Sequence, residues 1–332
     1  MRFPSDEIAL RCGGHLIGDG AVVTDGADID SSTLAAGSLF VAIVAERDGH
    51  DFVSAAFGAG AAAALVSQAV EGGPHVVVAD TAQALQTLGS AARERVGEAT
   101  IAITGSVGKT STKDLLIGAC RGHWRTHGSA GSFNNELGVP LTLINAPDDT
   151  DVAVVEMGAR GVGHIADLCA IARPDIGIVT SVGAAHTEMF GTLDDVAGAK
   201  GELVEALPGD GTAVLNMDDP LVAAMGGRTD ATVLGYGRTA GEIRAETVVV
   251  NADLRSSFQL RTPWGSSSVR LSVAGGHMVD NALAAAAGAL AAHTPLEAVV
   301  DGLQGASVSR WRMDVTTTEA GATIINDSYN AN

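Results

Sequence analysis

The residues at positions 105–110 have the types and order of a loop that binds phosphate. Glycines stand at 105 and 108, and Lys109 and Thr110 follow directly. A glycine-rich turn that enters a helix offers backbone N–H groups to an anion, and the helix dipole adds attraction. In such a loop Lys109 neutralises the outer phosphates, and the Thr110 hydroxyl is placed to bind Mg²⁺.

The loop matches a short form, GxxGKT, of the phosphate-loop pattern, because Ile103 stands where GxxxxGK[ST] has its first glycine. The apolar run 100–104 before it predicts a buried strand, and 109–120 after it predicts an amphipathic helix. A glycine turn that contains a lysine by chance is the alternative. This strand–loop–helix context favours a nucleotide site, whose predicted binding residues are Gly105, Ser106, Gly108, Lys109, Thr110 and Ser111.

Two further polar residues stand at the ends of apolar runs. Glu156 lies in the run 151–158, and His186 follows the run 174–183. Both runs are typical of buried parallel strands, whose carboxyl ends meet at the edge of a sheet where ligands bind. Taken alone, each residue also suits an ordinary role, as an acid at a strand end or as a structural histidine.

The elements that must position these residues are predicted from hydrophobic periodicity. The expected strands of the larger region are 100–104, 151–158, 174–183, 212–216 and 321–327, and its expected helices are 109–120, 193–207 and 278–293. The segment 246–275 predicts β-hairpins that decorate the sheet. The smaller region has expected strands at 39–45 and 75–80 and expected helices at 50–60 and 81–96.

These patterns predict an α/β fold class with more than one domain. We expect a small N-terminal α/β domain over residues 1–97. A central phosphate-loop domain, with a mostly parallel sheet flanked by helices, is expected over 98–320. Residues 321–332 are expected to begin a C-terminal domain that is missing.

Composition excludes several classes of partner. The 332 residues carry a net charge of −19, which argues against nonspecific binding of nucleic acid because such binding needs a basic surface. The longest apolar runs, such as 282–292, are too short to span a bilayer, so no membrane insertion is expected. The three cysteines are far apart and suit free thiols in a reducing cytoplasm.

Seven motifs occur in a fixed order: "ITGSVGKTST", "FNNELGVPLTLI", "VVEMGARGVGHI", "VTSVGAAHTEMFG", "AGAKGELVEALP", "SRWRMDV" and "INDSYNAN". As a set they resemble the Mur ligases of peptidoglycan synthesis. Residues 30–52 also resemble the nucleotide-sugar-binding N-terminal domain of that family. The resemblance therefore covers nearly the whole chain.

The resemblance implies an ATP-dependent ligase that forms a carbon–nitrogen bond through an acyl phosphate. The implied substrates are UDP-N-acetylmuramoyl-tripeptide and D-alanyl-D-alanine, and the implied cofactors are ATP and two Mg²⁺ ions. A cytoplasmic monomer that makes cell-wall precursors is expected.

The resemblance also assigns roles to individual residues. The implied metal ligands are Thr110, Glu156, His186 and Lys200, with Lys200 carbamylated by CO₂ and Glu188 orienting His186. Asn281 corresponds to an adenine contact and Asp327 to a ribose contact. Arg312 corresponds to an arginine near the phosphates, with Arg310 as the rival candidate. The implied catalytic residues are Lys109, Lys200, His186 and Arg312.

The implied substrate contacts lie nearer the N-terminus. They are Ser31, Ser32, Asp48, Gly49, His50, Asn134 and Asn135. The sequence departs from the family at Ser32, where an arginine is common, so a bidentate anion or peptide contact is lost.

Other readings remain open at this stage. A related Mur ligase or an enzyme like folylpolyglutamate synthase shares the central ATPase, although the latter lacks a domain like residues 1–97. A noncatalytic nucleotide-binding module would need Lys109, but not Glu156, His186 and Lys200 together.

Overall fold

A computed structural model describes residues 1–18, 20–129, 131–183, 191–319 and 321–329. Its contacts divide the chain into two compact units. The first contains Met1–Val96 and Phe133–Thr150, and the second contains Gly97–Ser132 and Asp151–Asn332. Residues 133–150, expected in the central domain, thus cluster with the N-terminal residues, and the division at 97 and 320 stays a prediction.

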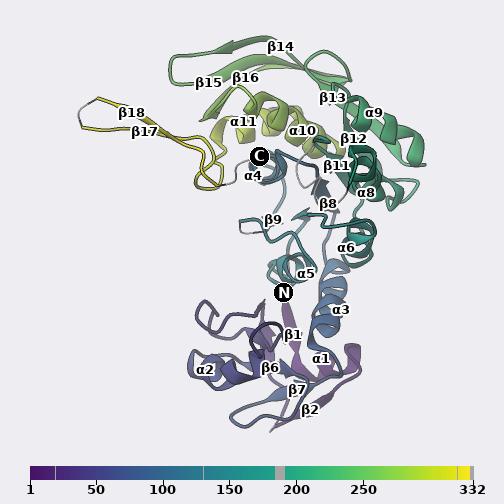
Figure 1. Ribbon diagram of the computed structural model, residues 1–332, viewed down its shortest axis with the longest axis vertical. Coiled ribbons are helices and arrows are strands. Elements are labelled where there is room, and N and C mark those ends of the chain that lie inside the picture. Colours follow the sequence, from purple (N-terminus) through teal and green to yellow (C-terminus); the bar gives the residue numbers. More distant parts are fainter. Residues whose placement is uncertain (19, 130, 184–190, 320, 330–332) are drawn as a thin grey trace. The chain divides into compact units, whose positions relative to one another are not determined.

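The first unit is built on a five-stranded sheet in the order β2-β7-β6-β5-β4 (Figure 1). The strands of the first unit, which also include the separate pair β1–β3, are β1 (Arg2–Pro4), β2 (His15–Ile17), β3 (Val23–Asp25), β4 (Ala27–Asp28), β5 (Leu39–Val41), β6 (Ala63–Val66) and β7 (His75–Val77). Its helices are α1 (Ser5–Arg11), η1 (Gly49–Phe52), α2 (Val53–Gly58), α3 (Thr81–Arg93) and α5 (Gly138–Ile144). The strands from β7 to β4 are parallel, β2 pairs antiparallel with β7, and β1 pairs antiparallel with β3.

Helix α5 belongs to the core of the first unit although it is distant in sequence. All seven of its residues are buried, and it packs against α3 and β4. Asn145, which follows it, bonds both the N–H and the carbonyl of Ala27 at 2.9 Å. The first unit is therefore completed by a segment that the chain reaches only after entering the second unit.

The second unit has a nine-stranded sheet in the order β16-β15-β14-β13-β12-β11-β8-β10-β9. Its strands are β8 (Ala99–Thr104), β9 (Thr126–Gly128), β10 (Val152–Glu156), β11 (Ile176–Val179), β12 (Thr212–Asn216), β13 (Thr232–Gly237), β14 (Ile243–Val250), β15 (Arg255–Thr262) and β16 (Gly265–Ala274). Pairing is parallel from β14 to β9 and antiparallel at β14–β15 and β15–β16. A separate hairpin joins β17 (Asp314–Thr317) and β18 (Thr323–Asn326).

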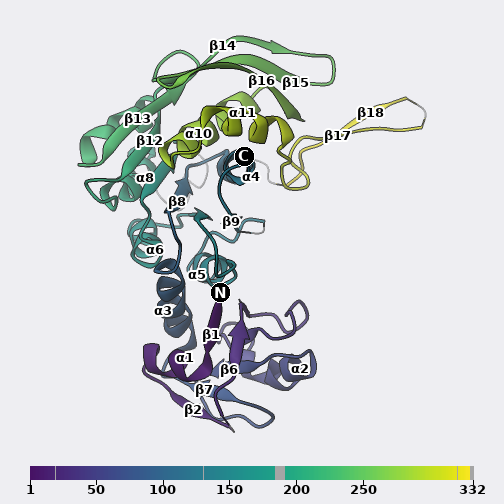
Figure 2. The same cartoon turned by 180° about the vertical axis from the view of Figure 1, so that it is seen from behind.

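Helices cover both faces of this sheet (Figure 2). They are α4 (Lys109–Arg121), α6 (His164–Ala172), α8 (Leu193–Glu205), α9 (Pro220–Ala223), η2 (Ala224–Arg228), α10 (Met278–Ala291) and α11 (Leu296–Gly305). Helices α4, α10 and α11 pack together, and α6 packs on α8. A Cβ on Gly302 would lie 2.2 Å from the Gly118 carbonyl oxygen, so glycine permits the close approach of α11 to α4.

The expected α/β class is confirmed, since a mostly parallel sheet with helices on both faces forms the second unit. The β-hairpins expected over 246–275 are present, because β15 pairs antiparallel with both β14 and β16. They differ from the expectation in one respect, since they extend the main sheet as its outer strands. Every residue of β8 is buried, as the reading of a strand covered on both faces requires. No helix in the described part of the chain combines the length and apolarity needed to cross a membrane.

Candidate active site

The predicted phosphate loop connects β8 to α4, and its glycines have the conformations that such a turn needs. Gly105 has a φ of 148°, and Gly108, at the N-cap of α4, has a φ of 87°. A Cβ at Gly105 would lie 1.9 Å from Thr180 Oγ1. No side chain caps α4, so the backbone N–H groups of its first turn stay available to an anion.

The loop is held by the segment that follows β11. The Thr180 hydroxyl donates to the Val107 carbonyl at 2.6 Å, and the Ser106 N–H donates to the Ser181 carbonyl at 2.9 Å. The Gly183 N–H donates to Ser106 Oγ, also at 2.9 Å. These bonds fix the loop before any ligand arrives, and sequence reasoning did not single out Thr180.

Thr110 joins an acid and an arginine from distant parts of the second unit. Its hydroxyl donates to Glu156 Oε2 at 2.8 Å and accepts from Arg312 Nη2 at 2.9 Å. Glu156 is 1% exposed at the carboxyl end of β10, as its place in the sequence predicted. The structure therefore brings together three residues that the sequence separates by up to about two hundred positions.

Two lysines add positive charge beside this group. Lys109 Nζ donates to the Gly105 carbonyl at 2.7 Å. Burial lowers the pKa of Lys109, Glu156 opposes that shift and Arg312 adds to it. Burial, followed by the charge of Lys109, lowers the pKa of Lys200 to about 7. The mutual effects mean that these cations share one electrostatic environment.

The chain contains three lysines among its 332 residues, and all of them lie in the second unit on α4 or α8. Lys113, the third, is 1% exposed. Its Nζ donates to the carbonyls of Ser129 and Gly131 at 2.7 Å each and lies 3.2 Å from Asp114 Oδ1. Lys113 thus holds the segment after β9 against the helix of the phosphate loop.

The charge at this site is opposite to that of the whole chain. Lys109 interacts electrostatically with Glu156, Arg312 and Lys200, so three basic side chains gather near the Glu156 carboxylate in a protein with a net charge of −19. A local excess of positive charge with free helix N–H groups suits an anionic ligand, such as a triphosphate.

His186 and Glu188 lie outside the described residues. Within the described ranges no group of three or more histidine, cysteine, aspartate or glutamate side chains is arranged to hold a metal ion. The Thr110 hydroxyl and the Glu156 carboxylate nevertheless provide two oxygen atoms in direct contact that could ligate a metal ion. Oxygen donors of this kind fit Mg²⁺.

The other residues predicted near the nucleotide are placed as follows. Asn281 is 8% exposed, and its Oδ1 accepts from the Thr112 hydroxyl at 3.4 Å. A Cβ on Gly108 would lie 2.5 Å from the same oxygen, so Asn281 packs directly on the phosphate loop. Asp327 Oδ1 accepts from the Met313 N–H at 3.1 Å, next to Arg312. Arg310 is exposed, whereas Arg312 reaches Thr110.

The predicted substrate residues all lie in the first unit. His50 Nδ1 contacts Asp48 Oδ1 at 2.6 Å, and His50 Nε2 accepts from the Ser67 N–H at 2.9 Å. Both ring nitrogens are therefore used inside the unit, and the His50 side chain is only 5% exposed. Gly49 begins η1, whose N-cap is Asp48. The pair Asp48–His50 thus shapes this turn.

The remaining substrate candidates stand at two other turns. The Ser32 hydroxyl and N–H both donate to Asp30 Oδ1, at 2.7 and 2.8 Å, and Ser31 lies between them in the turn. Asn135 Oδ1 accepts from the N–H of Gly138 at 2.8 Å at the start of α5. Asn134 precedes it in the same unit.

Two residues that the sequence reading missed connect elements around the site. Glu202 accepts from the N–H of Gly163 at 2.6 Å and of Ala166 at 3.0 Å, at the start of α6. The Tyr329 ring lies 4.1 Å from Arg312 Cζ. Glu202 lies in the motif "AGAKGELVEALP" and Tyr329 in "INDSYNAN". Membership of these motifs was the one sequence signal that could have identified them.

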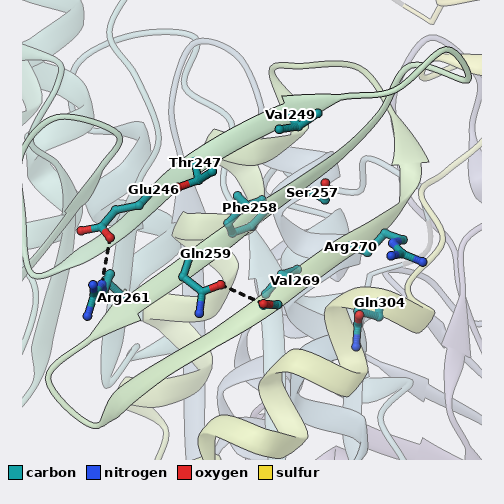
Figure 3. Close-up of a pocket in the computed structure, with 11 residues that line it drawn as sticks. Glu246, Thr247, Val249, Ser257, Phe258, Gln259, Arg261, Val269, Arg270 and Gln304 are labelled. Atoms are coloured by element: carbon teal, nitrogen blue, oxygen red, sulfur yellow. Dashed lines mark hydrogen bonds and ion pairs between the residues drawn. The ribbon is translucent and has the colours of Figure 1, made fainter.

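A groove lies on the outer strands of the second unit, away from the phosphate loop. This groove, of about 720 Å³, is formed mainly by residues of β14, β15 and β16 (Figure 3). It is polar, with Glu246 paired to Arg261 at 2.9 Å and the Ser268 hydroxyl bonded to Gln259 at 2.8 Å. It contains none of the predicted site residues.

Comparison with known proteins gives consistent matches. The model of the Mur ligase middle domain matches residues 103–289. The UDP-N-acetylmuramoyl-tripeptide–D-alanyl-D-alanine ligase of Mycobacterium tuberculosis is 41% identical over 93% of this chain and 66% of its own length. A crystal structure of MurF from Acinetobacter baumannii is 32% identical, with a TM-score of 0.89 over 100% of this chain and 74% of that one.

A further structure shares the fold and holds a nucleotide. MurF from Thermotoga maritima, solved in complex with ADP, is 27% identical, with a TM-score of 0.80 over 93% of this chain and 72% of that one. The chain spans about two thirds of the length of the mycobacterial relative.

Proposed function

The chain belongs to the Mur ligase family, and on this premise we propose that it joins D-alanyl-D-alanine to UDP-N-acetylmuramoyl-tripeptide at the expense of ATP. The relatives of that name are similar along 93% of the chain, which includes residues of both units. This extent supports a precursor ligase over a noncatalytic nucleotide-binding module. We propose a cytoplasmic monomer, as the sequence led us to expect.

One observation carries the proposal: Arg312 and Lys109 meet the Thr110–Glu156 pair beside an uncapped helix N-terminus, and Lys200 lies within the electrostatic reach of Lys109. A ligase that phosphorylates a carboxylate must bring one anion onto another. Repulsion between the two must be offset by fixed positive charge at the reacting oxygens. A protein that only binds nucleotide has less need of Lys200 at this position.

In the first proposed step a carboxylate oxygen of the tripeptide attacks the γ-phosphorus of ATP, and ADP leaves. The Lys109 ammonium and the N–H groups of the first turn of α4 bind the phosphate oxygens. Arg312, which bonds to the Thr110 hydroxyl, stabilises the charge that spreads over the transferred group. Thr180 and Ser106 keep the loop in shape, so little reorganisation is needed.

In the second proposed step the amine of D-alanyl-D-alanine attacks the acyl carbon. Inorganic phosphate leaves, the amine nitrogen loses a proton, and an amide bond remains. Lys109 and Arg312 then stabilise the departing phosphate. The first unit, with Ser31, Ser32, Asp48, Gly49, His50, Asn134 and Asn135, is proposed to hold the nucleotide-sugar end of the substrate.

Mg²⁺, when bound, supplies charge neutralisation at the phosphate oxygens. Thr110 and Glu156 are the residues that would hold one ion, because their oxygens are adjacent and suit its hard character. We propose a second ion held by Lys200 as its carbamate and by His186. Asn281 and Asp327 are proposed to face the adenine and ribose.

The lowered pKa of Lys200 supports carbamylation of its side chain. A pKa of about 7 leaves about half of its amines neutral at pH 7. The neutral amine is the form that adds to CO₂, giving a carbamate and a proton. Carbamylation would exchange a buried positive charge for a negative one that can bind metal.

The proposed function is tested by isotope transfer. The tripeptide carboxylate is labelled with ¹⁸O and incubated with ATP, Mg²⁺, D-alanyl-D-alanine and the protein. The acyl-phosphate route predicts one labelled oxygen in the inorganic phosphate released per amide formed. Amide formation with unlabelled phosphate would contradict it.

Calorimetric binding measurements provide a second test of the proposed function. Calorimetry should detect UDP-N-acetylmuramoyl-tripeptide but not dihydrofolate, which tests against an enzyme like folylpolyglutamate synthase. Lys109→Met should weaken ATP binding by at least about 10-fold while muramyl-ligand affinity stays unchanged. A folded protein that does not bind the muramyl ligand would contradict the substrate assignment.

A further inference from the structure

Arg312 lies in a turn whose backbone is strained on both sides. Trp311 has a φ of 65° and Met313 a φ of 53°, so both adopt the left-handed conformation that residues other than glycine avoid. Such strain persists only where the surroundings impose it, and it is frequent at functional sites.

Several hydrogen bonds impose this turn. Asp314 Oδ2 accepts from the Trp311 N–H at 2.6 Å, and Asp327 Oδ1 accepts from the Met313 N–H at 3.1 Å. The Tyr329 N–H donates to the Trp311 carbonyl at 3.2 Å. The turn is thus held by the strands of the β17–β18 hairpin and by the residues that follow it.

A contact from α4 anchors the approach to the turn. Asp114 Oδ2 accepts from both the N–H and the hydroxyl of Ser309, at 2.7 and 2.8 Å. Asp114 is on the same helix as Thr110, four residues further along the chain. The segment that delivers Arg312 is therefore fixed to the helix that Arg312 must reach.

The side chain of Arg312 is held by an aromatic ring. Tyr329 places its ring 4.1 Å from Arg312 Cζ. Its hydroxyl is hydrogen-bonded to the Ser132 hydroxyl, which lies just after the segment held by Lys113. The ring is therefore fixed at its outer end while its face meets the guanidinium.

Arg312 has a buried donor that lacks a partner among the described residues. Its Nη2 bonds to Thr110, but its Nε is buried and has no acceptor among the described residues. A buried donor without a partner is costly, and its N–H is available to an oxygen from outside the protein. An anionic oxygen beside Thr110 and Lys109 would satisfy it.

We propose that Tyr329 is a positioning residue, whose ring holds the Arg312 guanidinium against Thr110 and leaves Nε free for an oxygen of the bound phosphoryl group. The identity of that group rests on the proposed function, whereas the positioning rests on the contacts of Tyr329 alone. A guanidinium over an aromatic face is attracted by the ring and loses little freedom on binding. Tyr329 therefore orders the Arg312 guanidinium in the protein without bound nucleotide.

The test is a double-mutant cycle on the affinity for Mg²⁺–ATP, measured by calorimetry. Arg312→Ala is expected to weaken binding by about 10- to 100-fold. Tyr329→Leu removes the ring and should cost about 3- to 10-fold, and Tyr329→Phe, which keeps the ring, less than about 2-fold. In the Arg312→Ala background, Tyr329→Leu should cost nothing more, because its only route is through Arg312.

A ligand-free measurement keeps the proposal separate from the proposed function. The relaxation of the ¹⁵N-labelled Arg312 Nε–H, assigned with Arg312→Lys, should report an ordered group in the wild type and in Tyr329→Phe. In Tyr329→Leu it should report a mobile one. If the wild type binds no nucleotide, the proposed function falls and this relaxation measurement alone decides the positioning role.

Phe52→Leu is the matched control, since Arg47 lies 4.3 Å over the Phe52 ring in the first unit. It removes a comparable pair and should change neither readout at Arg312. Three results would overturn the proposal. They are a further loss of 3-fold or more on adding Tyr329→Leu to Arg312→Ala, an Arg312 Nε that stays ordered in Tyr329→Leu, and a Tyr329→Phe variant as weak as Tyr329→Leu.

Discussion

At the scale of single residues, Lys200 is the side chain whose surroundings oppose its ordinary charge. It is 6% exposed and faces the charge of Lys109, which together lower its pKa from 10.5 to about 7. Between these two values the unfolded chain keeps the proton while the folded protein has lost it. Stability should therefore rise with pH across this window.

The prediction compares the wild type with Lys200→Met in CO₂-free buffer. Between pH 7 and 9 the wild type should gain roughly 1.4 kcal/mol of unfolding free energy per pH unit relative to the variant. Urea unfolding at several pH values measures this difference. Parallel curves for the two proteins would mean that Lys200 keeps its ordinary proton affinity.

Gly108 is a second residue whose replacement has a defined cost. Gly108→Ala meets both a positive φ of 87° and a Cβ position 2.5 Å from Asn281 Oδ1. Strain alone should cost about 1–2 kcal/mol, and displacement of Asn281 should reduce nucleotide affinity by at least about 10-fold.

The control for this change is Gly37→Ala, at a φ of 90° in open space. It carries the strain without the collision, so its effect on stability should be smaller and nucleotide affinity should not change. Chemical unfolding and calorimetry measure the two quantities. Equal losses in both variants would show that contact with Asn281 does not matter.

The residues of the phosphate loop could be predicted because their signal is local. Gly105, Gly108, Lys109 and Thr110 are defined by spacing within one turn between a strand and a helix. The partners of Thr110 and of Asp327 could not be read from the residues alone, because they depend on contacts over long stretches of chain. His50 shows the same limit, since only the fold reveals that both of its ring nitrogens are already used.

At the scale of elements, helix α6 is capped by another helix. Its N-cap is Gly163, which has no side chain to accept from the first turn. Glu202 of α8 supplies both carboxylate oxygens in its place. The loop after Glu156 is thereby tied to the helix that carries Lys200.

Glu202→Ala should therefore cost about 1–2 kcal/mol of unfolding free energy, because two N–H groups lose a charged acceptor. Hydrogen exchange at the Gly163 and Ala166 amides should become faster than in the wild type. Glu205→Ala on the same helix, which breaks a partly exposed ion pair with Arg228, should cost about 0–1 kcal/mol. Similar losses in both variants, with unchanged exchange, would contradict the capping role.

Elements with a clear hydrophobic pattern could be predicted, among them the short strands β8 and β12, whereas the buried helix α5 could not. The expected helices at 109–120 and 278–293 correspond to α4 and α10, whose lengths give the pattern several turns to repeat. Helix α5, with the sequence GVPLTLI, is seven residues long and buried all round. It has no polar face to set a period, and its β-branched residues resemble a strand, so packing rather than propensity decides its structure.

At the scale of the whole molecule, neither unit is one continuous stretch of chain. The first unit needs residues 133–150, which supply α5. That helix buries Val139, Leu141, Leu143 and Ile144. Each buried aliphatic side chain is worth about 1.5–3 kcal/mol, so their sum is comparable with the total stability of a small domain.

A fragment of residues 1–96 should therefore unfold without a cooperative transition. The same fragment joined through a glycine–serine linker to residues 133–150 should recover a cooperative one. Calorimetry and near-ultraviolet circular dichroism compare the two. Cooperative unfolding of the shorter fragment would show that α5 is dispensable.

The position of the lysines has a practical consequence. All three lie on α4 or α8, and Lys113 and Lys200 are almost inaccessible. An endoprotease that cuts only after lysine therefore finds hardly any target on the folded surface, although arginines are plentiful there. Cleavage by such an enzyme would therefore require transient opening of the second unit. The cleavage rate would report how readily that unit opens.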